Sequence, residues 1–407
     1  MSLGATSDDR ASAARSGLLA GSTLVAAGLA VGQVLGYVLN VVGARTLGPS
    51  GYGELSALLG LLLIGNVVAL AVQTVASRRT SVGSDDARRL DPLGIRFGAA
   101  EATVALVLVP VLAHLVKVDV VALGALSLAF LPMTASGVAL GVVQGDGRFP
   151  RLALQYAALA GIRTGLALVA LLLWHDVRAV GLGLLLGAVL AWWVVSGLGG
   201  AGRWTRARPS RVMTTETLHV SHALVAMFTF TSFDVLVARA LQDAEPAGQY
   251  AAGAILVKIA FWLPQAVVVA AFPQMSTRES GALRRAALLV AALGATLVLG
   301  AAALGPSVVP PVLGAGYDVA ASHAWLFVLV GVLESLAYLV VFDRLASRDR
   351  NAVWTVWAAV LLVVVLATTV GRSPVALAWV LASVSLVLCV AGLLVPRREE
   401  PPEPLDD

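Results

Sequence analysis

The stretch LNVVGARTL at residues 39–47 closes the first long apolar run of the chain, and FDVLVARAL at residues 233–241 closes the seventh. The two stretches are 194 residues apart, and each holds an Asn or Asp five residues before an arginine. A proline, a glycine and a tyrosine follow in both places, at residues 49–52 and 246–250. Similarity at one long offset indicates an internal repeat. The simpler alternative is that two apolar helices resemble each other by chance.

The overall composition is that of a membrane protein. Hydrophobic residues make up 58% of the chain and charged residues 13%, and the mean hydropathy is +0.88. A soluble domain is about half apolar and a quarter charged. The net charge of +4 would indicate a nucleic-acid partner only if the basic residues clustered on a soluble face. They lie in short loops instead, so we expect a polytopic membrane protein that binds no nucleic acid.

Apolar runs of about 20 residues, long enough to cross the hydrocarbon core, occur twelve times. They lie near residues 18–44, 52–76, 94–115, 120–143, 151–174, 179–202, 217–240, 249–274, 284–304, 320–343, 352–371 and 374–395. We expect no signal peptide, because the first run is long and leads straight into the second. The longest polar stretches are too short to form a domain, which excludes an enzyme that acts in a soluble domain.

These runs predict an all-α integral membrane protein with about twelve transmembrane helices in two six-helix bundles. Six spans per copy is an even number, so the repeat is parallel, and substrate paths in such transporters run between the halves. The predicted parts are a cytoplasmic tail at 1–17, a first bundle at 18–202, a cytoplasmic linker at 203–216, a second bundle at 217–395 and a Pro-rich acidic tail at 396–407.

Arginine and lysine are unevenly distributed over the loops. Of the 28, 21 lie in the two tails and in the loops after even-numbered runs, and five lie in the loops on the other side. Cytoplasmic loops retain positive charge, so both termini are predicted to be cytoplasmic. The two remaining basic residues, Arg163 and Lys258, fall inside predicted spans.

Three loop motifs carry a resemblance to a known family. They are ARTLGPSGYG at 44–53, QGDGRF at 144–149 and LGAGY at 313–317. Together with the six-plus-six topology, they make essentially the whole chain similar to bacterial polysaccharide-export flippases. These belong to the multidrug/oligosaccharidyl-lipid/polysaccharide exporter (MOP) superfamily.

The resemblance implies a flippase of the bacterial plasma (inner) membrane that works by alternating access. Its substrate would be an undecaprenyl-pyrophosphate-linked oligosaccharide, moved from the inner to the outer leaflet for cell-surface polysaccharide synthesis. The implied partners are this lipid-linked oligosaccharide, membrane lipid, glycosyltransferases and a polysaccharide polymerase.

Charged residues inside the spans are the first candidates for function. They are Glu101, Arg163, Asp234, Lys258 and Glu334. A charge at mid-bilayer costs roughly 2.5 to 3.5 kcal/mol even on the lenient insertion scale, so each should face a cavity or a partner. Each base either contacts an anionic substrate or forms an ion pair that docks helices. Glu101 and Glu334 are expected to couple an ion or to join such a pair.

Two helix faces predict a substrate site. Tyr156 and Arg163 are seven residues apart on one span, and Lys258, Trp262 and Gln265 share a face of another. An arginine fork or a lysine ammonium suits a pyrophosphate, and aromatic faces beside them suit sugar rings. Arg163 is the stronger candidate, because Lys258 lies nearer the outer half, where its side chain can reach water.

Further polar positions predict a cavity wall or gate. Gln33 and Asn40 are one heptad apart on the first span, as Asn66 and Gln73 are on the second. A polar face on a membrane helix more often looks inward than toward lipid. Asn40 and Asp234 occupy equivalent places in the repeat, about 7.5 Å inside the outer ends of their spans. They are expected to line or latch the outer mouth, and interfacial solvation is the alternative.

Two other functions stay open. A cation-coupled multidrug exporter of the same superfamily would need an ion-binding carboxylate, and relatives of that branch often carry it on the first span. Here the strongly polar interior residues of that span are only Gln33 and Asn40, although Asp234 could supply the carboxylate. A non-transporting scaffold for glycan-assembly enzymes gains nothing from the intramembrane charges. No nucleotide, metalloprotease or hydrolase motif occurs, so we expect no enzyme activity, no cofactor and no metal site.

Overall fold

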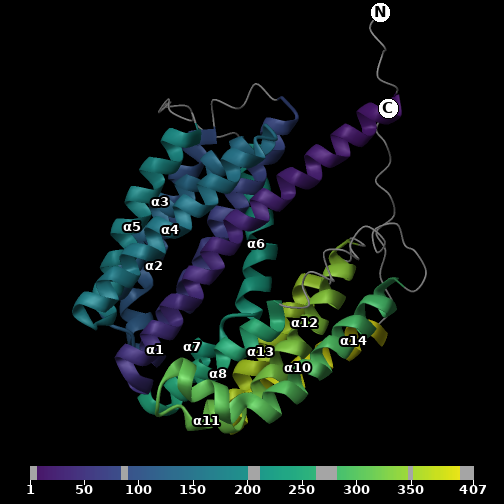
Figure 1. The fold of residues 1–407 in the computed structure, drawn as a ribbon. Coiled ribbons are helices and arrows are strands. Elements are labelled where there is room, and N and C mark those ends of the chain that lie inside the picture. Colours follow the sequence, from purple (N-terminus) through teal and green to yellow (C-terminus); the bar gives the residue numbers. More distant parts are fainter. Residues whose placement is uncertain (1–6, 84–89, 200–210, 263–281, 347–351, 395–407) are drawn as a thin grey trace, which may run out of the picture. The chain divides into compact units, whose positions relative to one another are not determined.

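The structure, a computed structural model, describes residues 7–83, 90–199, 211–262, 282–346 and 352–394. These residues form helices joined by short turns, with no strand among them, which confirms the all-α prediction (Figure 1). The tail at 396–407, most of the linker at 203–216, and the second half of the eighth run lie outside the described residues.

The helices follow the predicted runs closely. They are α1 (Ser7–Ser81), α2 (Leu90–Val116), α3 (Val120–Gly145), α4 (Phe149–Trp174), α5 (Val177–Gly199), α6 (Arg211–Phe230), α7 (Asp234–Leu241), α8 (Ala244–Trp262), α10 (Ala282–Leu313), α11 (Asp318–Ser322), α12 (Ala324–Ala346), α13 (Ala352–Val370) and α14 (Pro374–Leu394). α6 and α7 together form the seventh run.

Nine helices in the described part are long and apolar enough to cross a membrane, and ten if α6 and α7 count as one span. This count treats α1 as a single helix, although it contains the first two predicted runs. α1 folds back at Gly48, whose φ of 64° and ψ of 179° are not helical, and Pro49 follows directly. Glycine adopts this positive φ without the steric cost that a Cβ would impose. Dividing α1 at this kink raises the count to eleven, and α8 lies in the eighth predicted run, so the helices are consistent with about twelve spans.

The chain divides into two compact units. Unit 1 comprises 1–39, 65–111 and 119–222, and unit 2 comprises 40–64, 112–118 and 223–407. The bundle boundaries at 18–202 and 217–395 stay a prediction. The contacts add that the folded tip of α1 (40–64) and the end of α2 with the turn after it (112–118) pack with the later half of the chain.

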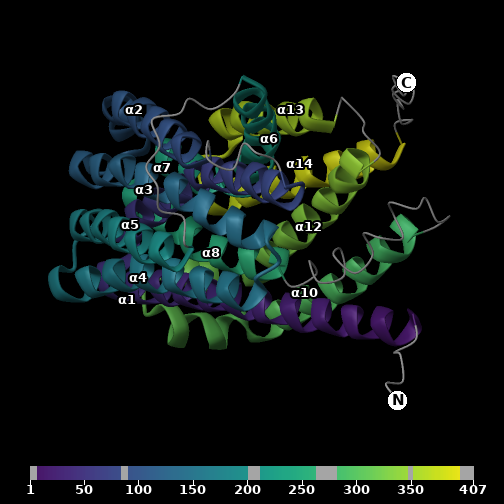
Figure 2. The same ribbon diagram turned by 90° about the horizontal axis from the view of Figure 1, so that it is seen from above.

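Close helix approaches build unit 1. α5 packs against both α3 and α4, and the three helices lie side by side in both views (Figures 1 and 2). Gly137, Gly141 and Gly145 form a stripe on α3 against the second half of α1. A Cβ at these glycines would lie only 2.4 to 2.5 Å from carbonyl oxygens of α1. Such small-residue stripes let membrane helices pack backbone to backbone.

Unit 2 repeats this arrangement around α12, which packs against α8, α10 and α14. α14 contacts α12 and α13 as α5 contacts α3 and α4. Gly331 on α12 lies 194 residues after Gly137, and its Cβ would be 2.2 Å from the Val257 carbonyl oxygen on α8. Both glycines are on the fourth span of their copy and face its second span. The repeated packing supports the internal duplication indicated by the sequence.

Candidate functional site

A hydrogen-bonded polar group joins three helices of unit 1. The side-chain amide of Gln73, on α1, donates to Gln144 Oε1 of α3 at 2.8 Å and to the Tyr156 hydroxyl oxygen of α4 at 2.5 Å. Gln73 is only 5% exposed, so these bonds satisfy an amide that the apolar surroundings would otherwise leave unpaired. Gln73 and Tyr156, both predicted from the sequence, are thus brought together.

Arg163 and Asn66 lie one heptad away from this group. Successive helices alternate in direction, so α4 runs antiparallel to the second half of α1. Seven residues forward from Tyr156 and seven back from Gln73 therefore lead to the same level, about 10 Å along the bundle. α5 approaches Arg163 closely, because a Cβ at Gly187 would lie 2.6 Å from the Arg163 Cα.

Arg163 has no acidic partner within the part of the chain that the structure describes. Its Nε is buried and makes no hydrogen bond to any described residue. Glu101, the intramembrane acid of the same unit, has a different partner. Its Oε2 accepts a 2.6 Å hydrogen bond from Thr134 Oγ1 on α3. Its Oε1 is buried without a hydrogen bond from the described residues.

The charges of unit 2, in contrast, gather in one cluster. Asp234 and Glu334 are each 3% exposed, and the partly buried Lys258 is within electrostatic reach of both carboxylates. The Tyr250 hydroxyl donates to Asp234 Oδ2 at 2.9 Å. Asp234 Oδ1 is buried and has no hydrogen bond from the described part of the chain. With all three groups ionised, the cluster carries one net negative charge.

The first copy of the repeat contains an uncharged version of the same contact. The Tyr52 hydroxyl donates to Asn40 Oδ1 at 2.9 Å, as Tyr250 does to Asp234 at 2.9 Å. Both tyrosines are fully buried. Each contact ties the helix before a turn to the helix after it. The equivalence of Asn40 and Asp234 is therefore one of three-dimensional contacts as well as of sequence.

The remaining predicted residues are scattered. Gln33 is exposed on α1 of unit 1, and Trp262 is 48% exposed at the end of α8. Gln265 lies outside the described residues. The sequence reasoning did not select Gln144, Thr134, Tyr52 or Tyr250, although both tyrosines stood in the repeat and Gln144 in a quoted motif. Within the described ranges, no three His, Cys, Asp or Glu side chains form a group that could hold a metal.

Known proteins of solved structure share this architecture. No protein-family model matches the chain, and no curated protein matches its sequence. Several solved structures do match in fold. An inward-facing multidrug resistance MATE family transporter of the MOP superfamily has a TM-score of 0.69 at 14% identity, covering 91% of this chain and 96% of its own. This chain has the fold of a MOP-superfamily transporter.

Two further solved structures also match in fold. The lipid II flippase MurJ, in an inward closed conformation, has a TM-score of 0.72 at 11% identity, covering 91% of this chain and 87% of its own. A MOP transporter from Pyrococcus furiosus has a TM-score of 0.61 at 13% identity, with coverages of 92% and 94%. The chain is thus a multi-pass membrane protein similar in fold to transporters. The similar structures include both a drug transporter and a lipid flippase.

Proposed function

We propose that this protein is a flippase that moves an undecaprenyl-pyrophosphate-linked oligosaccharide from the inner to the outer leaflet by alternating access. The supporting observation is Arg163, an intramembrane base without an acidic partner among the described residues. A base kept only to dock helices would be expected beside a carboxylate, as Lys258 is. An unpaired guanidinium instead suits an anionic ligand, because its forked donors match phosphate oxygens.

Polar groups within about one heptad of Arg163 suit the uncharged part of such a substrate. Asn66, Gln73, Gln144 and Tyr156 are neutral groups that both donate and accept hydrogen bonds, as sugar hydroxyls do. The Tyr156 oxygen accepts from Gln73, so the hydroxyl proton remains to be donated elsewhere. We therefore assign the pyrophosphate to the level of Arg163 and the first sugar to the level of Tyr156.

The test measures flipping of a fluorescent undecaprenyl-pyrophosphate oligosaccharide in proteoliposomes. Arg163→Gln removes a charge-assisted contact worth roughly 1.5 to 3 kcal/mol, so affinity should fall about 10- to 150-fold while thermal stability stays unchanged. Arg178→Gln is the matched control, because Arg178 is an outer arginine paired with Asp119 at 2.8 Å. Flipping by Arg163→Gln at the wild-type rate and affinity would remove the proposal.

A second candidate, a cation-coupled multidrug exporter, is favoured by the unit 2 cluster. Asp234, Lys258 and Glu334 together lack one positive charge, and a buried uncompensated charge is costly. A proton or Na⁺ taken up there would restore neutrality. Export of a cationic drug driven by an imposed proton or Na⁺ gradient, with no flipping of the lipid-linked oligosaccharide, would favour this candidate.

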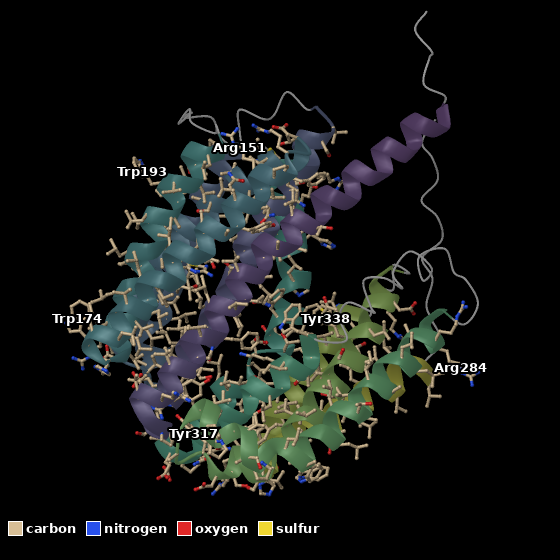
Figure 3. The ribbon with its side chains drawn as sticks, in the orientation of Figure 1. Arg151, Trp174, Trp193, Arg284, Tyr317 and Tyr338 are labelled. Carbon is tan, nitrogen blue, oxygen red and sulfur yellow. The ribbon has the colours of Figure 1, made fainter. Side chains whose placement is uncertain are left out.

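The proposal includes the location and partners that the resemblance implies. The protein would lie in the bacterial inner membrane with both termini in the cytoplasm, and work with glycosyltransferases and a polysaccharide polymerase. Arg151 and Trp174 lie at opposite ends of α4, as expected for a cytoplasmic arginine and an interfacial tryptophan (Figure 3). Reporter fusions after Arg45 and Arg372 should read periplasmic, and fusions after Arg79 and Arg348 cytoplasmic. The reverse pattern would overturn the orientation.

A further inference from the structure

We infer that the turn between α10 and α11 is a clip that fixes the outer fold of α1 to unit 2, with Arg45 as its positioning residue. The Gly48–Pro49 kink then stays rigid while the transporter changes state. The inference rests on the proposed transport function for its role, and on contacts within unit 2 for its structure. It joins two of the motifs on which the family resemblance rests, residues 44–53 and 313–317.

The first contact is between Arg45 and the end of α10. Arg45 Nε donates to the Val312 carbonyl oxygen at 2.8 Å, and Nη2 donates to the Pro311 carbonyl oxygen. The last carbonyls of a helix have no partner within the helix and carry its negative dipole end. A cation that bonds two of these carbonyl oxygens supplies their missing hydrogen bonds and also offsets the negative charge of the helix end.

The second contact is a buried tyrosine pair. The Tyr317 hydroxyl donates to the Ala44 carbonyl oxygen at 2.8 Å, and its ring meets Tyr52 edge-on at a centroid distance of 6.1 Å. Burial raises the pKa of Tyr317, so the hydroxyl keeps the proton that it donates. Tyr317 lies beside the folded tip of α1 (Figure 3). This contact brings the turn and the tip together away from water, where a lost hydrogen bond is costly.

The third contact is with the start of α8. A Cβ at Gly248 would lie 1.7 Å from the Pro49 carbonyl oxygen, so only glycine lets α8 approach the kink this closely. Next to it, Gln249 Nε2 donates to the Gly316 carbonyl oxygen, and Gln249 Oε1 accepts from the Val319 backbone N–H at 3.3 Å. The kink is thus held by α8 as well as by the turn after α10.

The chain path shows where bending has to occur instead. Residues 40–64 belong to unit 2, whereas the rest of α1 belongs to unit 1. α1 therefore passes between the units at Leu39–Asn40 and again at Ile64–Gly65. Any rearrangement of the two units bends α1 at these two places and leaves the clipped tip intact. Gly36 lies close to the first of them, and a Cβ there would meet nothing within 4 Å.

A disulfide in place of the Arg45 contact tests the clip. A Cβ at Gly314 would lie 3.9 Å from Arg45 Cα and 3.7 Å from its Cγ, so the two positions are near enough for a disulfide. Gly314 has a φ of 103°, which strains any residue that has a Cβ, so Gly314→Cys alone is the control for that strain. The double variant Arg45→Cys/Gly314→Cys is made in a Cys389→Ser background. Reduced, it should transport about tenfold more slowly than Gly314→Cys alone, and Arg45→Ala about tenfold more slowly than wild type. Oxidised, it should recover, because the covalent bond replaces the lost contact.

Three outcomes of these experiments bear on the clip. A double variant that transports when reduced and stops when oxidised would mean that tip and turn separate during the cycle, which overturns the clip. So would wild-type transport by Arg45→Ala. Tyr317→Phe removes only the hydroxyl and should produce a smaller loss. Arg372→Ala, at an exposed arginine in another outer turn, is the matched control and should change nothing.

Thermal stability separates this inference from the proposed function. Arg45→Ala should lower the unfolding temperature of the purified protein, and the oxidised disulfide should restore it, whatever the substrate. If wild type moves no lipid-linked oligosaccharide but these shifts occur, the clip stands and the proposed function fails. Unchanged unfolding temperatures in Arg45→Ala and Tyr317→Phe would overturn the clip by itself.

Discussion

The contacts Asn40–Tyr52 and Asp234–Tyr250 are two copies of one design. In each, a tyrosine after a proline–glycine turn donates to a side-chain oxygen on the preceding helix, at 2.9 Å in both cases. The difference is the acceptor, an amide in the first copy and a carboxyl in the second. The geometry of the contact therefore does not require a charged acceptor. We infer that the carboxyl of Asp234 has a role beyond accepting this hydrogen bond.

The groups around Asp234 are charged. Lys258 lies within electrostatic reach of the Asp234 carboxylate and of Glu334, and the first copy has no charged group at Asn40. We therefore predict a structural role for the tyrosine contact in both copies and an ion-coupling role in the second alone. Three sets of variants test it, in decreasing order of expected effect.

Lys258→Met should produce the largest effect. It leaves Asp234 and Glu334 without the base that lies within electrostatic reach of both, and leaving a buried charge uncompensated costs about 3–5 kcal/mol. Chemical unfolding of the purified protein measures the loss. Adding Glu334→Gln should restore most of it, because a single carboxyl then remains. Unchanged stability in Lys258→Met would mean that the three charges do not act as a group.

Removing each tyrosine hydroxyl tests whether the two hydrogen bonds differ in strength. A hydrogen bond to a charged group contributes about 1.5–3 kcal/mol and one between neutral groups about 0.5–1.5 kcal/mol. Tyr250→Phe should therefore lower the free energy of unfolding more than Tyr52→Phe does. The two variants form a matched pair, since both rings are fully buried. Equal losses would indicate that the carboxyl of Asp234 is uncharged in the folded protein.

Asp234→Asn turns the second contact into a copy of the first and should have the smallest effect on stability, within about 1 kcal/mol. The amide oxygen can still accept from Tyr250, and Lys258 and Glu334 are left as a neutral pair. Transport should lose its dependence on pH or Na⁺ while the protein stays folded. Transport assays across imposed gradients measure this. A variant that keeps the wild-type gradient dependence would exclude Asp234 from coupling.

The amino-acid sequence by itself determined the helices, the repeat and the equivalence of Asn40 and Asp234. Apolar run length, Pro–Gly turns and a constant offset are local properties, and the membrane requires every spanning segment to satisfy its own backbone. Tyr156 and Arg163 share a helix face for the same local reason, the helical period. The sequence could also place five charges inside spans, because insertion cost marks them as exceptional.

Only the tertiary structure decided which of these charges meet. Lys258 lies with Asp234 and Glu334, whereas Arg163 has no acid near it among the described residues, and the sequence left both arrangements open for both bases. It also brought residues 44–53 against residues 313–317, more than 250 positions later in the chain. Such pairings depend on which helix faces turn toward each other, and that is set by the packing of whole helices, such as the glycine stripe of α3 on α1. No local pattern in the chain records it.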